Sequence, residues 1–160
     1  MVVPKNQGPS MTRSIRSFGA EEPGQSYRLR PGGYALIRDP SGNLAVILTD
    51  SGMLLPGGGQ DGAETPSQAA VREVVEEAGL HVEITACVGV ADQLVYARSE
   101  EVYYRKRETF FLASVVGQEL SKQEAGHLLQ WIPPRLAYEQ LSEAAQRWAL
   151  GVAWPSLVAG

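Results

Sequence analysis

Three glutamates, Glu73, Glu76 and Glu77, lie three or four positions apart in a segment rich in helix-forming residues. Such positions are neighbours on an α-helix, so the three carboxylates share one side of it. Because like charges repel at this spacing, three together favour a compensating cation. Mg²⁺ and Mn²⁺ prefer oxygen ligands, so the segment predicts a divalent-cation site. A solvated acidic face, partly neutralised by Arg72, is the simpler alternative for the segment taken alone.

The segment that carries these glutamates has the start and stop signals of a single helix. Thr65 is a good N-cap, Pro66 suits the first helical position, and Gln68 completes a capping box with Thr65. Gly79 is a natural C-terminal stop. We expect the helix to bury the aliphatic face opposite the carboxylates, which consists of Val71, Val74, Val75 and Ala78.

A loop of three glycines precedes this helix and begins a longer pattern. From Gly58 to Leu80 the chain reads G-x5-E-x7-R-E-V-x-E-E-x-G-L. This run resembles the signature of the Nudix hydrolase family, G-x5-E-x7-R-E-U-x-E-E-x-G-U, where U is a bulky aliphatic residue. All nine specified positions are filled. The chain departs from many relatives at Met53-Leu54, where they carry a tryptophan, and this affects packing near the site rather than its chemistry.

The resemblance covers about residues 34–150 and implies both a fold and a reaction. The fold is an α/β/α sandwich with a mixed sheet. The reaction is divalent-metal-dependent hydrolysis of a phosphoanhydride bond in a nucleoside diphosphate derivative. Mg²⁺ or Mn²⁺ is the implied cofactor. The implied metal ligands are the carbonyl of Gly57 and the carboxylates of Glu73, Glu76 and Glu77.

Other residues of the pattern acquire roles from the same resemblance. Arg72 acts in catalysis together with Glu73 and Glu76, by orienting Glu73 through a salt bridge. Glu64 is a supporting acid. Gly58 and Gly59 bind substrate, because their bare backbone lets metal and phosphate approach closely.

Candidate residues also lie outside the pattern. Glu124 precedes a strand bearing Trp131 and is a metal ligand, a general base or an ordinary loop acid. Arg105 and Arg107 share a face if they lie on a strand, so they either contact substrate phosphates or form a solvated strand end. Tyr96 lies 16 residues after Leu80, where some dinucleoside polyphosphate hydrolases of the family carry a tyrosine, and it is a candidate for stacking on a base.

The composition narrows the class of protein. The chain has 160 residues and a net charge of -4, which does not favour nucleic acid as a partner. Cys87 is the single cysteine, so no internal disulfide is possible, and with two histidines a zinc site is not expected. No apolar run is long enough to span a membrane. We therefore expect a cytoplasmic protein without a nucleic-acid or membrane partner, and a homodimer stays open. A small-molecule nucleotide substrate is what the family resemblance implies.

The domain organisation expected from the sequence is simple. Residues 1–26 form a mobile tail, with a transit peptide as the weaker alternative, and residues 27–160 form a single domain. A β-hairpin is expected from residues 34–38 and 44–49. Further expected elements are strands within residues 81–95, 102–116 and 128–132, and helical structure over residues 135–150.

The substrate is weakly encoded, and several hypotheses remain open. A nucleoside triphosphate or a dinucleoside polyphosphate ranks first, ahead of a nucleotide sugar or ADP-ribose. A non-catalytic nucleotide-binding sensor is the rival class, although such domains usually carry a damaged signature. RNA decapping ranks lower because the chain has no basic tract.

Overall fold

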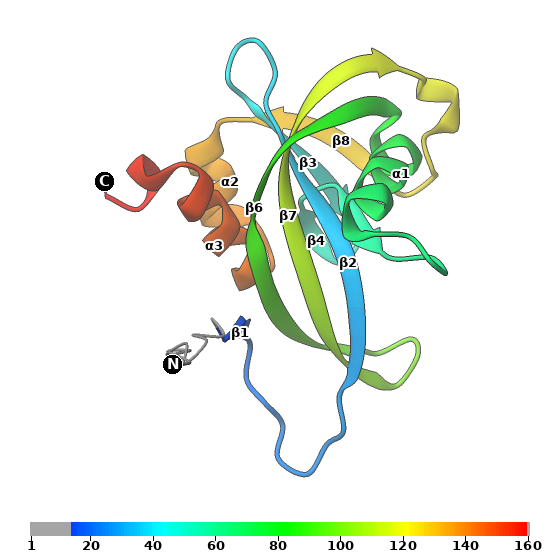
Figure 1. Ribbon diagram of the computed structural model, residues 1–160, viewed down its shortest axis with the longest axis vertical. Coiled ribbons are helices and arrows are strands. Elements are labelled where there is room, and N and C mark those ends of the chain that lie inside the picture. Colours follow the sequence, from blue (N-terminus) through cyan, green and yellow to red (C-terminus); the bar gives the residue numbers. More distant parts are fainter. Residues whose placement is uncertain (1–13, 160) are drawn as a thin grey trace, which may run out of the picture.

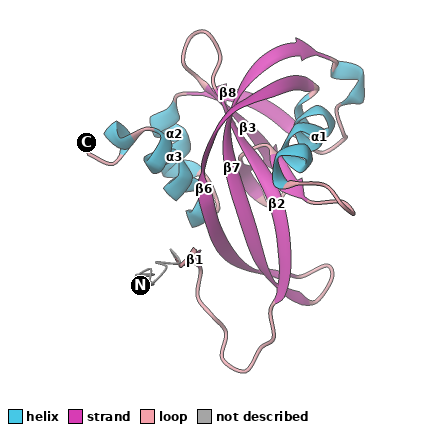
Figure 2. Cartoon of the chain, in the orientation of Figure 1, coloured by secondary structure: helices cyan, strands magenta, loops and turns pink. Residues whose placement is uncertain are grey.

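The computed structural model describes residues 14–159, which form two β-sheets flanked by helices (Figures 1 and 2). Helix α1 lies on one side of the strands, and helices α2 and α3 lie on the other. The expected α/β/α arrangement is therefore confirmed. The helices and strands are β1 (Arg16–Phe18), β2 (Arg28–Ile37), β3 (Leu44–Thr49), β4 (Gly52–Leu54), β5 (Gly57–Gly59), α1 (Pro66–Ala78), β6 (Leu80–Ala97), β7 (Val102–Gln118), β8 (Leu128–Ile132), α2 (Pro134–Gln140) and α3 (Ala144–Ala153).

The larger sheet is mixed and has the strand order β1-β6-β7-β2-β5. Strands β6 and β7 form a long antiparallel hairpin, while β2 runs parallel to β7 and antiparallel to β5. In this register Gly32 pairs with both Glu108 and Gly59. The glycine loop of the sequence is thus a short edge strand, fixed beside β2.

The smaller sheet has the order β4-β3-β8, and it corrects one expectation. The segment from Asp39 to Asn43 makes the expected turn, with Asp39 N–H donating to the Asn43 carbonyl at 2.9 Å. However, β2 and β3 do not continue as a hairpin, because only the bridge between Arg38 and Leu44 joins them among the described residues. β2 pairs instead with β5 and β7, while β3 pairs with β4 and β8. The local pattern predicted the turn but not the partners of its strands.

Two apolar clusters hold the layers together. One lies against helices α2 and α3 and includes Phe110, Leu141 and Leu150. The other lies against α1 and includes Val74 and Leu80. Successive side chains of a strand point to opposite faces of the sheet. Phe110 of β7 therefore packs in the first cluster, whereas Ala113 packs in the second.

The junction between α2 and α3 is tied to the segment that leads into β5. Met53 N–H donates to the Ser142 hydroxyl at 3.1 Å, and Ser142 N–H donates to the Met53 carbonyl at 2.9 Å. Leu55 N–H donates to Oε1 of Gln146, a fully buried residue of α3, at 2.8 Å. The C-terminal helices therefore fix the segment from which the glycine strand begins.

The prediction of a mobile tail over residues 1–26 needs correction. Arg16–Phe18 do not belong to a mobile tail, because they form β1 and pair in parallel with Ala91–Gln93 of β6. Residues 1–13 of the expected tail lie outside the described residues. No described helix is long and apolar enough to cross a membrane.

Candidate functional site

Helix α1 carries the site and begins and ends where the sequence predicts. The Thr65 hydroxyl accepts from Gln68 N–H, and the Gln68 side chain accepts from Thr65 N–H. Gly79 closes the helix in the left-handed conformation. The buried face differs in one respect from the expected one, since Glu77 is only 7% exposed while Val71 and Val75 are only partly buried.

Arg72 is the centre of the acidic face. Its Nε and Nη2 donate to the two carboxylate oxygens of Glu64 at 2.8 and 3.0 Å. Its Nη1 donates to Glu73 Oε1 at 3.0 Å and to Glu76 Oε2 at 3.2 Å. Nη2 also donates to the Gly59 carbonyl at 3.0 Å. One guanidinium therefore joins α1, the loop after β5 and β5 itself.

These contacts support the roles expected for Arg72 and Glu64. The bidentate pair with Glu64 holds the guanidinium in one orientation, and such planar, charge-assisted pairs are strong hydrogen bonds. The Arg72 side chain lowers the pKa of the Glu64 carboxyl below its usual range, chiefly by hydrogen bonding. Arg72 therefore fixes the carboxylates of Glu73 and Glu76, and Glu64 in turn fixes Arg72.

Glu77 lies deeper than the other two acids of α1. Its Oε1 accepts from Gly57 N–H at 2.8 Å, which brings the helix against β5. Burial, and then the nearby charges of Glu73, Glu124 and Glu76, raise the pKa of Glu77 to about 8. The ionised carboxylate is therefore costly without a nearby cation.

Glu124 and His127 complete the acidic region from a loop before β8. Glu124 N–H donates to the Glu76 carbonyl at 2.6 Å, so the loop is attached to α1. The His127 ring stands between two acids, with Nε2 3.6 Å from Glu77 Oε2 and Nδ1 3.6 Å from Glu124 Oε2. The structure thus brings Glu124 to the acids of the helix, as expected from the sequence. Sequence reasoning did not include His127 among the site residues. The feature of the sequence that could have indicated it is its position three residues after Glu124.

Gly58 sets the distance between β5 and the helix. A Cβ on Gly58 would lie 2.7 Å from the carboxyl carbon of Glu73 and 2.8 Å from its Oε1. Any larger residue must therefore displace the Glu73 carboxylate. This close approach is the physical reason for glycine at the first position of the signature.

The donor set fits a hard divalent cation. The α1 acids supply carboxylate oxygens, and desolvation raises the pKa of both Glu73 and Glu77, with Arg72 opposing that rise at Glu73. Within residues 14–159 no three acidic, histidine or cysteine side chains already converge on one cation-sized position. The acids of this region therefore need small side-chain movements to share an ion.

Arg105 and Arg107 share a face of β7, as expected, but their charges already have a partner. Arg107 Nε and Nη2 donate to the carboxylate of Asp92 at 3.0 and 3.1 Å, and Arg105 Nη1 donates to the same group at 3.3 Å. Asp92 is only 3% exposed. This buried acid was missed by sequence reasoning, and the structure does not bring the two arginines into contact with the acids of α1.

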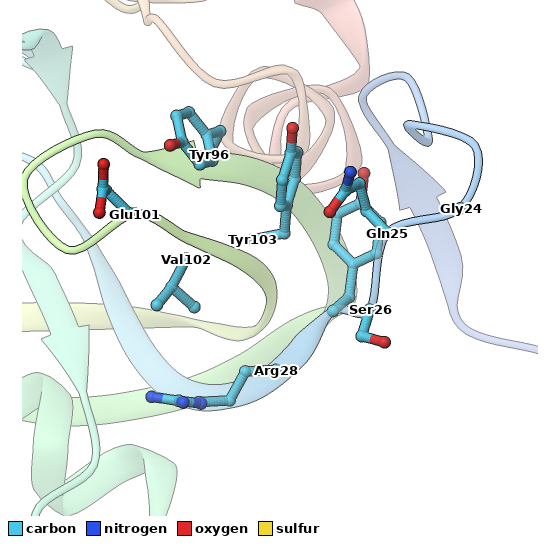
Figure 3. Close-up of a pocket in the computed structure, with 9 residues that line it drawn as sticks. Gly24, Gln25, Ser26, Arg28, Tyr96, Glu101, Val102 and Tyr103 are labelled. Carbon is cyan, nitrogen blue, oxygen red and sulfur yellow. The ribbon is translucent and has the colours of Figure 1, made fainter.

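Tyr96 lies near the end of the β6–β7 hairpin, beside Tyr103 (Figure 3), and this end of the hairpin lies away from α1 (Figure 1). Its ring packs 4.7 Å from that of Tyr103, which packs 5.4 Å from that of Tyr27. A cavity of about 770 Å³ adjoins these rings and the loop before β2. Glu108 of β7 pairs with Gly32, which in turn pairs with Gly59 of the glycine strand. Tyr103 is five residues from Glu108 along β7, or roughly 17 Å at the rise of a strand. The structure therefore places Tyr96 apart from the acidic region.

Comparison with known proteins gives a consistent result. A family model described as "NUDIX domain" matches residues 28–151. A Bacillus subtilis (strain 168) protein named "Putative 8-oxo-dGTP diphosphatase" is 32% identical over 80 residues, which are 50% of this chain and 49% of that protein. The chain thus spans about half the length of this curated relative.

Solved structures share the fold. A MutT NUDIX hydrolase from Burkholderia pseudomallei is 26% identical, with a TM-score of 0.59 over 77% of this chain and 96% of that one. The dihydroneopterin triphosphate pyrophosphohydrolase of E. coli is 16% identical, with a TM-score of 0.65 over 85% of this chain and 100% of that one. The latter likeness supports the fold alone.

Substitution of Glu77 by Gln should stabilise the metal-free protein, and more so at high pH. Folding raises the pKa of Glu77 from about 4.5 to about 8. Its contribution to stability is therefore fully present below pH 4.5 and is lost as the pH rises to 8. The amide of the variant does not titrate, so the difference in melting temperature between variant and wild type should be small at about pH 5 and largest at about pH 8, both in EDTA.

The matched control is Glu139→Gln, which changes an exposed acid of α2. It should leave the melting temperature nearly unchanged at both pH values. Equal effects of Glu77→Gln at the two pH values would show that Glu77 is not desolvated as described.

Proposed function

We infer the function from one premise: this chain belongs to the NUDIX family. We propose that it is a divalent-metal-dependent hydrolase that cuts a phosphoanhydride bond in a nucleoside diphosphate derivative. The observation that carries the proposal is the contact set of Arg72, which holds Glu73 and Glu76 on one side of the glycine strand. A sensor domain without activity has no need of a complete and oriented set of acids, so a catalytic function is favoured.

Each group of residues in the site has a proposed role. Glu73, Glu76 and Glu77, with the carbonyl of Gly57, hold Mg²⁺ or Mn²⁺. When bound, the cation neutralises phosphate charge and lowers the pKa of an attacking water. Arg72 keeps Glu73 and Glu76 in place, while Gly58 and Gly59 let the diphosphate approach the backbone.

Glu124 is the proposed general base. Its side chain is 59% exposed, so it is reachable by water, while its backbone is attached to α1 through Glu76. It would accept the proton of the attacking water as the phosphorus–oxygen bond of the anhydride breaks. His127 stands 3.6 Å from the Glu124 carboxylate and would help to orient it.

The substrate proposed first is a nucleoside triphosphate, followed by a dinucleoside polyphosphate. The name of one similar protein supports this order, since it describes a nucleoside triphosphate. Nucleotide sugars and ADP-ribose rank second. Stacking of a base on Tyr96 remains a proposal only for a substrate long enough to reach the end of the hairpin, and phosphate binding by Arg105 and Arg107 requires competition with Asp92.

Activity should depend strictly on a divalent metal. The purified chain should be incubated with Mg²⁺ and with nucleoside triphosphates, oxidised triphosphates, dinucleoside polyphosphates, ADP-ribose and nucleotide sugars. We expect at least one compound to be cleaved at a phosphoanhydride bond, no turnover in EDTA, and recovery when Mg²⁺ is added back. Full turnover by stripped protein would refute the metal mechanism, and tight binding without cleavage would favour the sensor.

Substitution of Arg72 by Ala should lower the apparent affinity for Mn²⁺ or the activity by about 10–100-fold, which is typical for loss of a residue that orients ligands. The reason is that Glu73 and Glu76 lose a shared partner. Mn²⁺ titrations of kcat and KM would locate the effect. Arg72→Lys is the comparison, because it keeps the charge but not the bidentate contact with Glu64. A loss confined to substrate KM, with unchanged Mn²⁺ activation, would mean that Arg72 binds substrate instead.

Substitution of Glu124 by Gln should lower kcat by about 10²–10⁴-fold if Glu124 is the base. The Mn²⁺ concentration needed for half activity should then stay the same. Glu119→Gln is the matched control, because Glu119 lies in the same loop region but pairs with His81 at 2.6 Å. A change in the Mn²⁺ requirement alone would make Glu124 a ligand, and no change in either quantity would remove it from the mechanism.

A further inference from the structure

A cavity of about 480 Å³ lies between β1 and the helices α2 and α3, which are on the opposite side of the strands from α1 (Figure 1). Its apolar walls are formed by Phe18 of β1, Tyr138 of α2, Trp148 and Val152 of α3, and Val158 from the segment after α3. Among the described residues that line it, none belongs to the family signature. Cavities of about 300–1,000 Å³ are typical of sites for small organic ligands. The volume therefore fits a small molecule, at a place separate from the acidic region.

Two arginines, Arg16 of β1 and Arg147 of α3, also line this cavity. The Arg16 guanidinium lies 5.3 Å from the centroid of the Phe18 ring, and Arg147 Nη1 donates to the Leu141 carbonyl. Unlike the arginines of the acidic region and of β7, neither forms an ion pair within residues 14–159. Among the described residues of the lining there is no acid. In a chain with a net charge of -4, two guanidinia at one cavity without an acidic partner favour an anionic ligand.

Two glycines fix the walls of the cavity. A Cβ on Gly151 would lie 2.8 Å from Cγ2 of Val158, so this glycine lets the segment after α3 fold back against the helix. Glycine is unfavourable inside a helix, and this close approach explains its presence there. A Cβ on Gly89 would lie 3.1 Å from Cη2 of Trp148, so the indole packs directly against β6. The Trp148 ring also packs 6.2 Å from that of Phe18, and the aromatic walls therefore have defined positions.

We propose that this cavity binds an aromatic carboxylate, independently of the hydrolysis proposed above. The carboxylate pairs with Arg16 and Arg147, because a guanidinium presents parallel donors to the two oxygens of such a group. The ring of the ligand packs against Phe18, Tyr138 and Trp148 in the offset or edge-to-face arrangements that aromatic groups prefer. The apolar walls and the two cations of the lining thus recognise different ends of one molecule.

The supply of hydrogen-bond donors favours a carboxylate over a phosphate. One nitrogen of Arg147 already donates to the Leu141 carbonyl, which leaves fewer N–H groups for a ligand. The aliphatic part of the lining donates no side-chain hydrogen bond. The two oxygens of a carboxylate can be satisfied by the remaining N–H groups, whereas a phosphate monoester brings three strong acceptor oxygens and up to two charges. The ligand is therefore expected to carry one carboxylate on a flat apolar body.

Calorimetry on the full chain with 2-naphthoate tests this proposal. The buffer should contain EDTA, so that a metal held by the acids of α1 cannot bind the carboxylate. We expect one 2-naphthoate per chain, bound about tenfold or more tightly than the uncharged 2-naphthylmethanol, because hydrogen bonds between charged groups are stronger than neutral ones. It should also bind more tightly than 2-naphthyl phosphate. No binding of 2-naphthoate, or equal binding of the alcohol, would overturn the proposal, and tighter binding of the phosphate would overturn the choice of a carboxylate.

Arg147→Gln and Arg16→Gln locate the binding site. Each removes one charge from the lining, and each should weaken the binding of 2-naphthoate about tenfold or more. Arg98→Gln is the matched control, because it changes an exposed arginine between β6 and β7, and it should keep the wild-type affinity. Arg147 also contacts the Leu141 carbonyl, so if its variant does not fold, the exposed Arg16 decides. Unchanged affinity in either folded variant would contradict a carboxylate site at these two arginines.

Discussion

The arrangement of the acidic region depends on a single guanidinium. Arg72 pairs with Glu64 in the loop after β5, with Glu73 and Glu76 on its own helix, and with the carbonyl of Gly59 on the edge strand. Without the Arg72 guanidinium the carboxylates would repel one another, and Glu64 would lose its side-chain contact with α1. The capped helix, the glycine strand and the loop are therefore separate pieces of local structure that become one site through a common partner.

The glycine strand β5 lets two chemically different regions lie very close together. On one side Gly58 faces the Glu73 carboxylate, and on the other Gly59 faces Arg30 and a small cavity next to Glu108. Three residues without side chains are the thinnest partition a folded chain can provide. The acids of α1 and the side chains of β2 and β7 therefore approach each other across β5 without a side chain between them.

The local parts of this design could be predicted from the sequence, and the long-range parts could not. The limits of α1, strand β8 and the acidic face follow from capping residues and periodicity, which are properties of neighbouring residues. The pairing of β2 with β7 rather than β3 involves residues far apart along the chain and leaves no local pattern. The same reason explains why Asp92 and Gln146 were missed, since their partners Arg107 and Leu55 are distant in sequence. Arg105 and Arg107 were correctly assigned to one face. Their buried counter-ion, Asp92, lies on β6, and the spacing of residues along β7 gives no information about it.

The hydrogen bond from Leu55 to Gln146 has a consequence for how the molecule opens. The two residues are 91 positions apart, yet the Leu55 amide cannot exchange its hydrogen with solvent until the Gln146 side chain leaves it. Local unfolding follows such cooperative units rather than the order of the sequence. Detachment of α3 would release the segment before Gly57 at the same time, so the lead-in to the glycine strand and the C-terminal helix should behave as one unit in native-state hydrogen exchange. Helix α3, which supplies none of the proposed metal ligands, would then govern how often the proposed site loses its shape.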